Sequence, residues 1–399
     1  MTALRALALL LLAAVLLTQS YIDLELEAAL GGWSINAPVA DLAALCLIPL
    51  AAHAWLSRRP HPLPGVGGYL LLLLAGALSL SNAILPDVGL HFLIRKPLFL
   101  YVAYAFGVVW AVRALPRRWV VGLLGAWAAS TAGLSLATSV LRIVGGDALW
   151  FSQLAGLTPN HKTLAVSLAG GLPLLFSASG LPGRRVLVGL AALAVFVSAS
   201  KTAWLMMLFG ASLFWPRSRP LGHRWQVIPV VILSVALAYY SPLLLKSRAM
   251  LDAARSRHSL NRRALQMFGA HPLLGGGVGM NVHLEQVTFP DYRVNGVDAH
   301  GVIQKIGSET GLVGLVGYGW FSLATLWGLR QRWEADGRSL DGVPYGALAT
   351  WGVSTAGLLL STETFSQTWW APVSVAWGLS HHPSLMQPQA PDPAGARAS

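Results

Sequence analysis

Apolar runs of about 20 residues follow one another along nearly the whole sequence, separated by short polar breaks. A bilayer core about 30 Å thick needs roughly 20 mostly apolar residues per helical crossing, and only helices or closed barrels satisfy their backbone groups there. The composition agrees, because 55% of the 399 residues are hydrophobic and 11% are charged, whereas soluble domains carry about 25% charged residues. We therefore predict an all-α, polytopic membrane protein.

Each of twelve apolar runs is predicted to form one membrane span. The first resembles a signal peptide, but further runs follow, so we interpret it as a retained helix. Only Lys201 separates the seventh run from the eighth, which predicts either a tight helical hairpin or one long broken helix. The spans are expected near residues 3–19, 38–56, 67–85, 97–114, 119–143, 163–180, 186–200, 202–216, 226–245, 312–329, 344–361 and 369–380.

The distribution of arginine predicts the orientation of these spans. If the N-terminus faces inward, every inner loop is basic, which is the pattern of cytoplasmic loops. The inner loops then hold Arg58, Arg59, Arg113, Arg117, Arg118, Arg184, Arg185, Arg217, Arg219, Arg224, Arg330, Arg332 and Arg338. We predict one transmembrane domain over residues 1–385 and a disordered inner tail, rich in Pro and Ala, over residues 386–399.

Residues 246–311 form an outward loop between the ninth and tenth predicted spans, far longer than a turn requires. Leu260, Ala264 and Phe268 recur at helical spacing in it, and Arg257 projects onto the same face. A buried guanidinium needs an anion, because an unpaired buried charge is very costly. That anion is either a protein carboxylate or a bound ligand.

Cations gather at the predicted outer membrane boundary, where topology alone does not require them. Arginine forks and lysine point charges suit phosphate oxygens, and a diphosphate lets several donors share one multiply charged group. A lipid-linked pyrophosphate is therefore the expected ligand class, although any single cation can instead pair with lipid head groups. The outer cations are Arg95, Lys96, Lys162, Lys201, Lys246, Arg248, Arg255, Arg257, Arg262 and Arg263.

Other site chemistries lack their motifs. The sequence has no phosphate-binding P-loop, and GGGVG at 275–279 follows a predicted helix, so we interpret it as a flexible turn. HxH and HExxH are missing, and HH at 381–382 lies on the inner side. Cys46 is the only cysteine, which rules out an intramolecular disulfide. We expect no metal, no cofactor and no nucleic-acid partner.

Two segments of the long loop resemble the O-antigen ligase and O-antigen polymerase superfamily. They read SRHSLNRRALQMFGAHPLLGGGVGMN at 256–281 and DAHGVIQKIGSETGLVGLVG at 298–317. TPNHKTLA at 158–165 is similar to the family's Asn-bearing outer segment, and SASKTAW at 198–204 is similar to its Ser-Arg hairpin, with Lys201 in place of arginine. Asn261 and Gly301 depart from residues common in the family, which bears on acceptor specificity and not on class.

The resemblance implies a metal-independent, inverting, membrane-embedded glycosyltransferase of the C type. Such an enzyme takes a glycan from undecaprenyl diphosphate at the outer leaflet of a bacterial inner membrane and joins it to an acceptor hydroxyl. Arg257 and His300 are the expected catalytic residues, His300 as a base or as a positioning group. Helical projection from His300 puts Gly307 and Gly311 on its face, whereas Glu309 lies opposite, where we favour a structural role. For the diphosphate we expect Arg95, Lys96, Lys201, Arg248 and Lys162 beside Arg257, and weaker candidates are Asn160, His161, Arg263 and Glu309.

Three functions remain open at this point. A ligase would extend lipid A core, and a polymerase would extend a second lipid-linked glycan, with the same donor site in both. A transporter for lipid-linked sugars would also explain outer cations, but it predicts inverted repeats and charged residues at mid-membrane. We find neither pattern, and we expect membrane lipids around the chain in all three cases.

Overall fold

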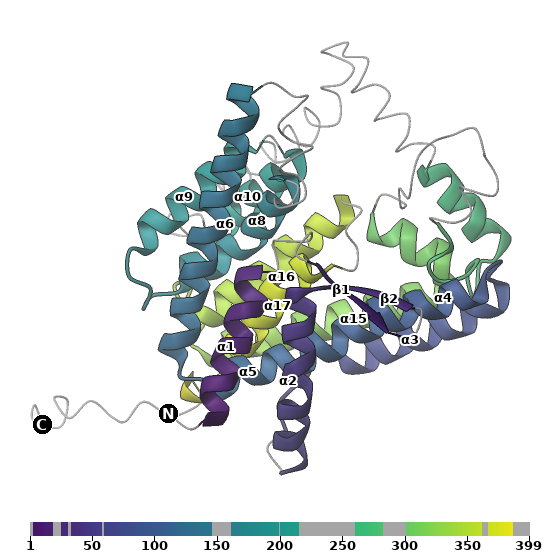
Figure 1. Ribbon diagram of the computed structural model, residues 1–399, viewed down its shortest axis with the longest axis horizontal. Helices are drawn as coiled ribbons and strands as arrows, with labels where there is room; N and C mark the ends of the chain where they lie inside the picture. The colour runs from purple at the N-terminus through teal and green to yellow at the C-terminus, as the bar shows by residue number, and fades with distance from the viewer. Residues whose placement is uncertain are drawn as a thin grey trace, which may run out of the picture.

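The computed structural model describes residues 3–18, 25–30, 33–57, 60–145, 161–198, 200–214, 260–281, 301–360 and 366–385. Helices dominate these residues, as the sequence predicts (Figure 1). The labelled α-helices are α1 (Ala3–Thr18), α2 (Val39–Leu56), α3 (Val66–Ser79), α4 (Pro86–Leu93), α5 (Val109–Ala114), α6 (Arg117–Gly145), α8 (His161–Ser177), α9 (Arg184–Val197), α10 (Lys201–Leu213), α15 (Val302–Ala335), α16 (Val343–Leu360) and α17 (Gln367–Ser380).

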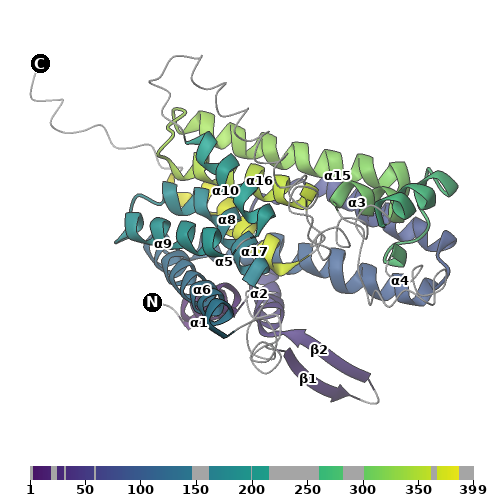
Figure 2. The same ribbon diagram turned by 90° about the horizontal axis from the view of Figure 1, so that it is seen from above.

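One short hairpin is an exception to the all-α prediction. Strands β1 (Glu25–Leu30) and β2 (Trp33–Pro38) pair antiparallel. Strand β2 runs directly into α2, and both strands project from the helical body (Figure 2). The sequence analysis assigned no structure to this connection.

Four described segments are long and apolar enough to cross a membrane: Val39–Leu56, Pro86–Ala114, Arg117–Thr138 and Val302–Ala335. Helices occupy the positions of the other predicted spans as well, except 226–245, which lies outside the described residues. One predicted boundary is wrong. The fourth helical segment starts at Pro86 and not at 97, because α4 continues through π-helical turns at Ile94–Leu98 and Tyr101–Val108 into α5. Helix α15 begins at Val302, and its non-helical Gly311 directly precedes the predicted start of the tenth span at 312.

Apolar stripes on the outside of the bundle fit a lipid environment. Leu70, Leu74 and Leu78 lie one turn apart on α3, and each is about half exposed. Leu312, Val316 and Trp320 form a similar exposed row on α15. Apolar patches of this kind are rare on soluble monomers. These helices therefore have apolar outer faces that match hydrocarbon.

The closest helix pair is α3 with α15, which lie side by side in both views (Figures 1 and 2). A Cβ on Gly68 would collide with the backbone of Phe321, so the absence of a side chain brings the two helices together. Tyr69 stacks on Tyr101 with ring centroids 4.1 Å apart, and Trp370 of α17 meets both rings edge-on. This aromatic cluster joins the α3–α15 pair to the centre of the bundle.

The second group of helices is α6, α8, α9 and α10, which packs on α16 and α17. Helices α9 and α10 form the tight hairpin that the sequence left open as one of two alternatives. Trp204 donates from Nε1 to the carbonyl of Phe196 at 3.0 Å, and the two rings stack. The Ser200 side chain caps α10 by accepting from the Ala203 amide.

Three buried histidines lie at the end of the bundle where α5 and α17 terminate. His61 donates from Nε2 to the Phe106 carbonyl at 3.0 Å, and His382 donates from Nε2 to the Leu115 carbonyl at 2.8 Å. Burial, together with the smaller effect of the nearby Arg113 charge, lowers the pKa of His61 to about 4. Burial also lowers the pKa of His381 to about 4. Both imidazoles are therefore neutral at neutral pH.

These pKa values predict acid lability. Between pH 6.5 and 4 the unfolded chain binds protons that folded His61 and His381 do not, so stability falls as pH falls through this window. We expect the melting temperature of the purified protein to drop by several degrees from pH 7 to 5. The double variant His61→Gln, His381→Gln should flatten the slope, whereas the exposed control His271→Gln should not. An unchanged slope in the double variant would contradict the assignment.

Candidate functional site

The most unusual backbone feature of α15 is a break at Gly311. Its φ of 65° and ψ of −160° are non-helical, so α15 consists of a short first part, residues 302–310, and a longer second part from 312. A break in a helix leaves carbonyls at the end of one part and amides at the start of the next without their usual partners. Inside an apolar body such groups must be satisfied by other protein groups.

The turn at residues 271–280 supplies those partners. The amides of Gly276 and Gly277 donate to the carbonyls of Ser308 and Glu309 at 2.8 and 3.2 Å. The amides of Leu312 and Val313 donate to the carbonyls of Pro272 and Leu273 at 2.8 and 3.2 Å. The turn therefore closes the break on both sides with backbone hydrogen bonds.

Glycine is required at both contact points. Gly275 has a φ of 71°, and a Cβ there would run into the backbone of Glu309. A Cβ on Gly311 would run into the Leu273 carbonyl. Both positions combine a backbone conformation that other residues rarely adopt with a close backbone approach.

The turn is also fixed to the end of α3 and to α4. Asn82 donates from Nδ2 to the Gly275 carbonyl at 2.9 Å, and the Val278 amide donates to Ser79 Oγ at 3.0 Å. The ring of Phe92 lies against Gly279. The expectation of a flexible turn at 275–279 is therefore wrong, because long-range hydrogen bonds that no local pattern encodes hold this segment.

Residues 260–270 form the helix that the sequence predicts in the long loop. Leu260 and Ala264 are buried and Arg262 is exposed, as expected, while Phe268 is half-buried beside Gly307. This loop helix and the first part of α15 both end at the turn. The two helices therefore lie together over their last turns.

Two buried charged residues occupy the first part of α15. Lys305 is 4% exposed and Glu309 is 2% exposed, and they stand one helical turn apart. The Lys305 ammonium lies 4.9 Å from the centroid of the Phe92 ring, a favourable cation–π arrangement. Lys305 was missed by the sequence analysis, although it lies inside the motif that carries the resemblance. Glu309 lies at the turn, which suits the structural role favoured for it.

Arg95 and Lys96 lie in the π-helical stretch directly after α4. Arg95 is exposed and Lys96 is half-buried. Both attract the carboxylate of Asp41 at the start of α2, which also accepts a hydrogen bond from Tyr104 at 2.9 Å. Arg263, in the loop helix, is half-buried. The structure thus brings Arg95, Lys96 and Arg263 onto the segments that surround the turn.

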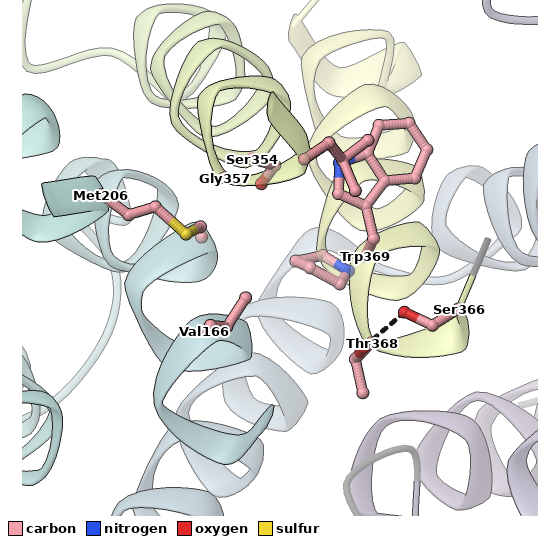
Figure 3. Close-up of a pocket in the computed structure, with 10 residues that line it drawn as sticks. Val166, Met206, Ser354, Gly357, Ser366, Thr368 and Trp369 are labelled. Carbon is pink, nitrogen blue, oxygen red and sulfur yellow. Dashed lines mark hydrogen bonds between the residues drawn. The ribbon is translucent and has the colours of Figure 1, made fainter. Parts of the chain in front are cut away.

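The remaining described candidates lie at two neighbouring helix starts. His161 and Lys162 open α8 and Lys201 opens α10, and the two helices pack together. About one turn further along each helix, Val166 and Met206 line a small cavity of about 20 Å³ (Figure 3). Such a volume holds about one water molecule.

Polar groups line part of this cavity. Ser366 and Thr368 share a hydrogen bond of 2.7 Å at the start of α17 (Figure 3). Ser354 Oγ and Trp369 Nε1 are buried and have no hydrogen-bond partner among the described residues. Three helices, α8, α10 and α17, therefore begin around one small, partly polar cavity.

The cavity and the start of α15 are neighbours. Leu358 of α16 lines the cavity, and the carbonyl of the next residue, Leu359, lies 3.0 Å from where a Cβ on Gly301 would be. Gly301 caps the start of α15. The two groups of candidate residues are thus connected through the end of α16.

Four candidates, Arg257, His300, Arg248 and Asn160, lie outside the described residues. Of His161, Lys162 and Lys201 only the backbone is described. Within the described ranges, no three His, Cys, Asp or Glu side chains form a group that could hold a metal ion.

Comparison with known proteins gives one family. Residues 186–319 match the family model described as O-antigen ligase. The matched range contains most of α9, all of α10, the loop helix, the turn, and α15 as far as residue 319, including the break at Gly311. No curated protein matches the chain.

The turn and the break make a testable pair. Gly311→Ala should destabilise the protein by at least about 1–3 kcal/mol, because alanine must adopt a strained backbone conformation and its Cβ meets Leu273. Gly319→Ala is the matched control in the same helix, since no atom lies within 4 Å of its Cβ position. Thermal unfolding in detergent measures both variants. If Gly311→Ala and Gly319→Ala unfolded at the same temperature, the claim that the turn closes the break at Gly311 would be refuted.

Proposed function

From the match of residues 186–319, which supports the O-antigen ligase superfamily for this chain, we propose that the protein is an O-antigen ligase. It transfers a glycan from undecaprenyl diphosphate to a hydroxyl of lipid A core at the periplasmic face of the inner membrane. The reaction is metal-independent and inverting. The family supports glycan ligation or polymerisation broadly, and donor, acceptor and mechanism belong to the proposal.

The observation that carries the proposal is the ordered turn at 271–280, which lies within the matched range. The loop helix and the first part of α15 both end at this turn. Arg257 precedes the loop helix by three residues, and His300 immediately precedes Gly301. Fixing the two helices to each other limits how far apart their preceding residues can lie. We propose that Arg257 and His300 face one common site.

The chemistry requires little beyond positioning and charge stabilisation. The acceptor oxygen attacks the anomeric carbon, the bond from that carbon to the diphosphate oxygen breaks, and the diphosphate leaves with the electron pair. His300 takes the acceptor proton, or it holds the hydroxyl in line while the departing diphosphate takes the proton. Arg257 stabilises the charge that grows on the departing diphosphate.

Further cations would hold the diphosphate before and after transfer. Lys162 and Lys201 open α8 and α10, and helix starts favour anions because their amides carry partial positive charge. The link between Gly301 and the end of α16 puts these helix starts near the α15 start. Arg95, Lys96 and Arg248 complete the proposed set. Asn160, His161 and Arg263 are weaker candidates for the same site.

Topology belongs to the same proposal. Twelve spans, both ends in the cytoplasm and a periplasmic loop at 246–311 put the turn, the loop helix and the starts of α8, α10 and α17 on the outer side. An outer site is where a glycan on an already translocated lipid carrier meets its acceptor. The basic inner loops of the sequence support this orientation.

A polymerase that extends a second lipid-linked glycan is the second candidate. It uses the same donor site, so the family match favours it equally. A transporter is less favoured, because transport does not require an acceptor-activating histidine.

Catalytic roles predict large losses of transfer. Arg257→Ala and His300→Ala should each lower glycan transfer by about 100-fold, because each removes a group that acts on the transition state. Arg262→Ala and His271→Ala are the controls. Arg262 lies in the loop helix and His271 directly follows it, and both side chains are exposed. Transfer is measured in vesicles containing equal amounts of inserted protein. Wild-type rates in the two candidate variants would exclude these roles.

A competition assay separates ligase from polymerase. The reconstituted protein receives undecaprenyl diphosphate glycan together with lipid A core, and the extended product is identified by mass spectrometry. We expect extended lipid A core. Extension of the lipid-linked glycan alone would instead assign a polymerase.

The metal-independent mechanism predicts that transfer continues after exhaustive chelation. The measurement is the transfer rate with and without chelator, followed by addition of divalent ions. A loss that divalent ions restore would overturn this part of the proposal.

A further inference from the structure

A cluster of cationic and imidazole groups lies at the end of the bundle where α5, α15 and α17 terminate. Trp377 donates from Nε1 to the Pro62 carbonyl at 2.9 Å, and His381 stacks on Trp377 with centroids 4.3 Å apart. His382 Nε2 lies 2.8 Å from the Leu115 carbonyl. These contacts bring the loop before α3, the end of α5 and the end of α17 to one place.

Arg113 is at the centre of this cluster. Its charge acts on His61, His381 and His382, and it faces the like charge of Arg332 from the last turn of α15. The Nε and Nη1 atoms of Arg113 are buried and have no hydrogen-bond partner in the part of the chain that the structure describes. Buried guanidinium nitrogens without an acceptor are costly.

The neighbouring carboxylates are engaged elsewhere. Glu334 pairs with Arg330 at 3.1 Å and with Arg338 at 3.4 Å. Asp336 is attracted by Arg117. None of the ion pairs found among the described residues joins a carboxylate to Arg113.

His61 adds a second unsatisfied group. It is 5% exposed, its Nε2 is used by the Phe106 carbonyl, and its Nδ1 is buried without a partner among the described residues. The ring is fixed by stacking on Phe106 at 5.1 Å. Because Nε2–H donates to the Phe106 carbonyl, Nδ1 of this neutral ring is an acceptor, so His61 borders the Arg113 site without donating to an anion there.

We propose that Arg113 and Arg332 form a binding site for one phosphate oxyanion. Guanidinium groups bind phosphate through paired, charge-assisted hydrogen bonds, and two arginines that repel each other are brought together at lower cost by a shared anion. The phosphate comes either from the head group of an anionic phospholipid or from solution. Basic pockets between membrane helices are suited to head groups.

This site is distinct from the proposed donor site. Helix α17 begins at the cavity of Figure 3 and ends at His381, and its 14 residues span about 20 Å. The proposal therefore does not depend on the transfer reaction. It assigns a second anion site at the opposite end of the same helix.

The test measures stabilisation of the purified full-length protein in detergent. Dioleoylphosphatidylglycerol, dioleoylglycerol without phosphate, and inorganic phosphate are titrated separately while the melting temperature is followed. We expect a phosphate-bearing probe to stabilise the wild type and dioleoylglycerol to do so less. Arg113→Gln and Arg332→Gln should each need about tenfold more of the probe or greater, the loss expected for one charged hydrogen bond.

Arg118→Gln is the matched control. Arg118 is an exposed arginine at the start of α6, four residues after Ala114 ends α5, and its guanidinium lies over the Trp119 ring. It should respond to each probe as the wild type does. Stabilisation by the phospholipid alone identifies a lipid head group, and equal stabilisation by inorganic phosphate identifies a soluble anion. The proposal is overturned if no phosphate probe exceeds dioleoylglycerol, or if Arg118→Gln loses as much as Arg113→Gln. Should Arg113→Gln fail to fold, Arg332→Gln carries the comparison.

Discussion

The break at Gly311 imposes the constraint on which the arrangement of the site depends. Backbone amides and carbonyls inside an apolar bundle need protein partners, and the turn at 271–280 is the segment that provides them. The same hydrogen bonds fix the loop helix to α15 and, through Asn82 and Ser79, to the end of α3. One local irregularity therefore determines where a long connection meets the membrane helices.

The charged side chains at the two ends of the bundle differ in how they are balanced. Lys305 and Glu309 are buried beside the turn, and Arg95 and Lys96 lie close to the Asp41 carboxylate. At the other end, the described carboxylates pair with or lie beside other arginines, while Arg113 has buried nitrogens for which the described residues provide no acceptor. Charges balanced by protein groups stabilise the fold, whereas unbalanced ones indicate where a ligand binds.

Much of the fold follows from periodicity and hydropathy alone. Apolar runs predicted the positions of α2, α6 and α16 to within a few residues, because hydrocarbon leaves the backbone few alternatives to a helix. The loop helix was predicted from the spacing of Leu260 and Ala264, and both are buried. These features are local, so a single sequence contains them.

The features that were missed depend on long-range partners. The glycines at 275–279 look like a flexible turn until their bonds to residues 308–309 are known. Gly311 follows the polar residues Ser308, Glu309 and Thr310 and precedes an apolar run, a pattern that marks the start of a membrane span but does not reveal that a helix already runs up to it. Lys305 resembles an exposed lysine at a helix start, and only the ring of Phe92, more than 200 positions away in the chain, reveals its burial. A positive charge followed four residues later by an acid was the one local signal.

In the proposed function, the two catalytic residues come before helices whose far ends the turn holds: Arg257 is three positions before the loop helix, and His300 directly precedes Gly301. The helix limits where a residue just ahead of it can lie, but the backbone of that residue keeps freedom that an internal residue lacks. The break and the turn hold the ends of both helices, so their starts are limited in range without being rigidly fixed. Under the proposed function, this site admits a long lipid-linked chain and then aligns one bond of it.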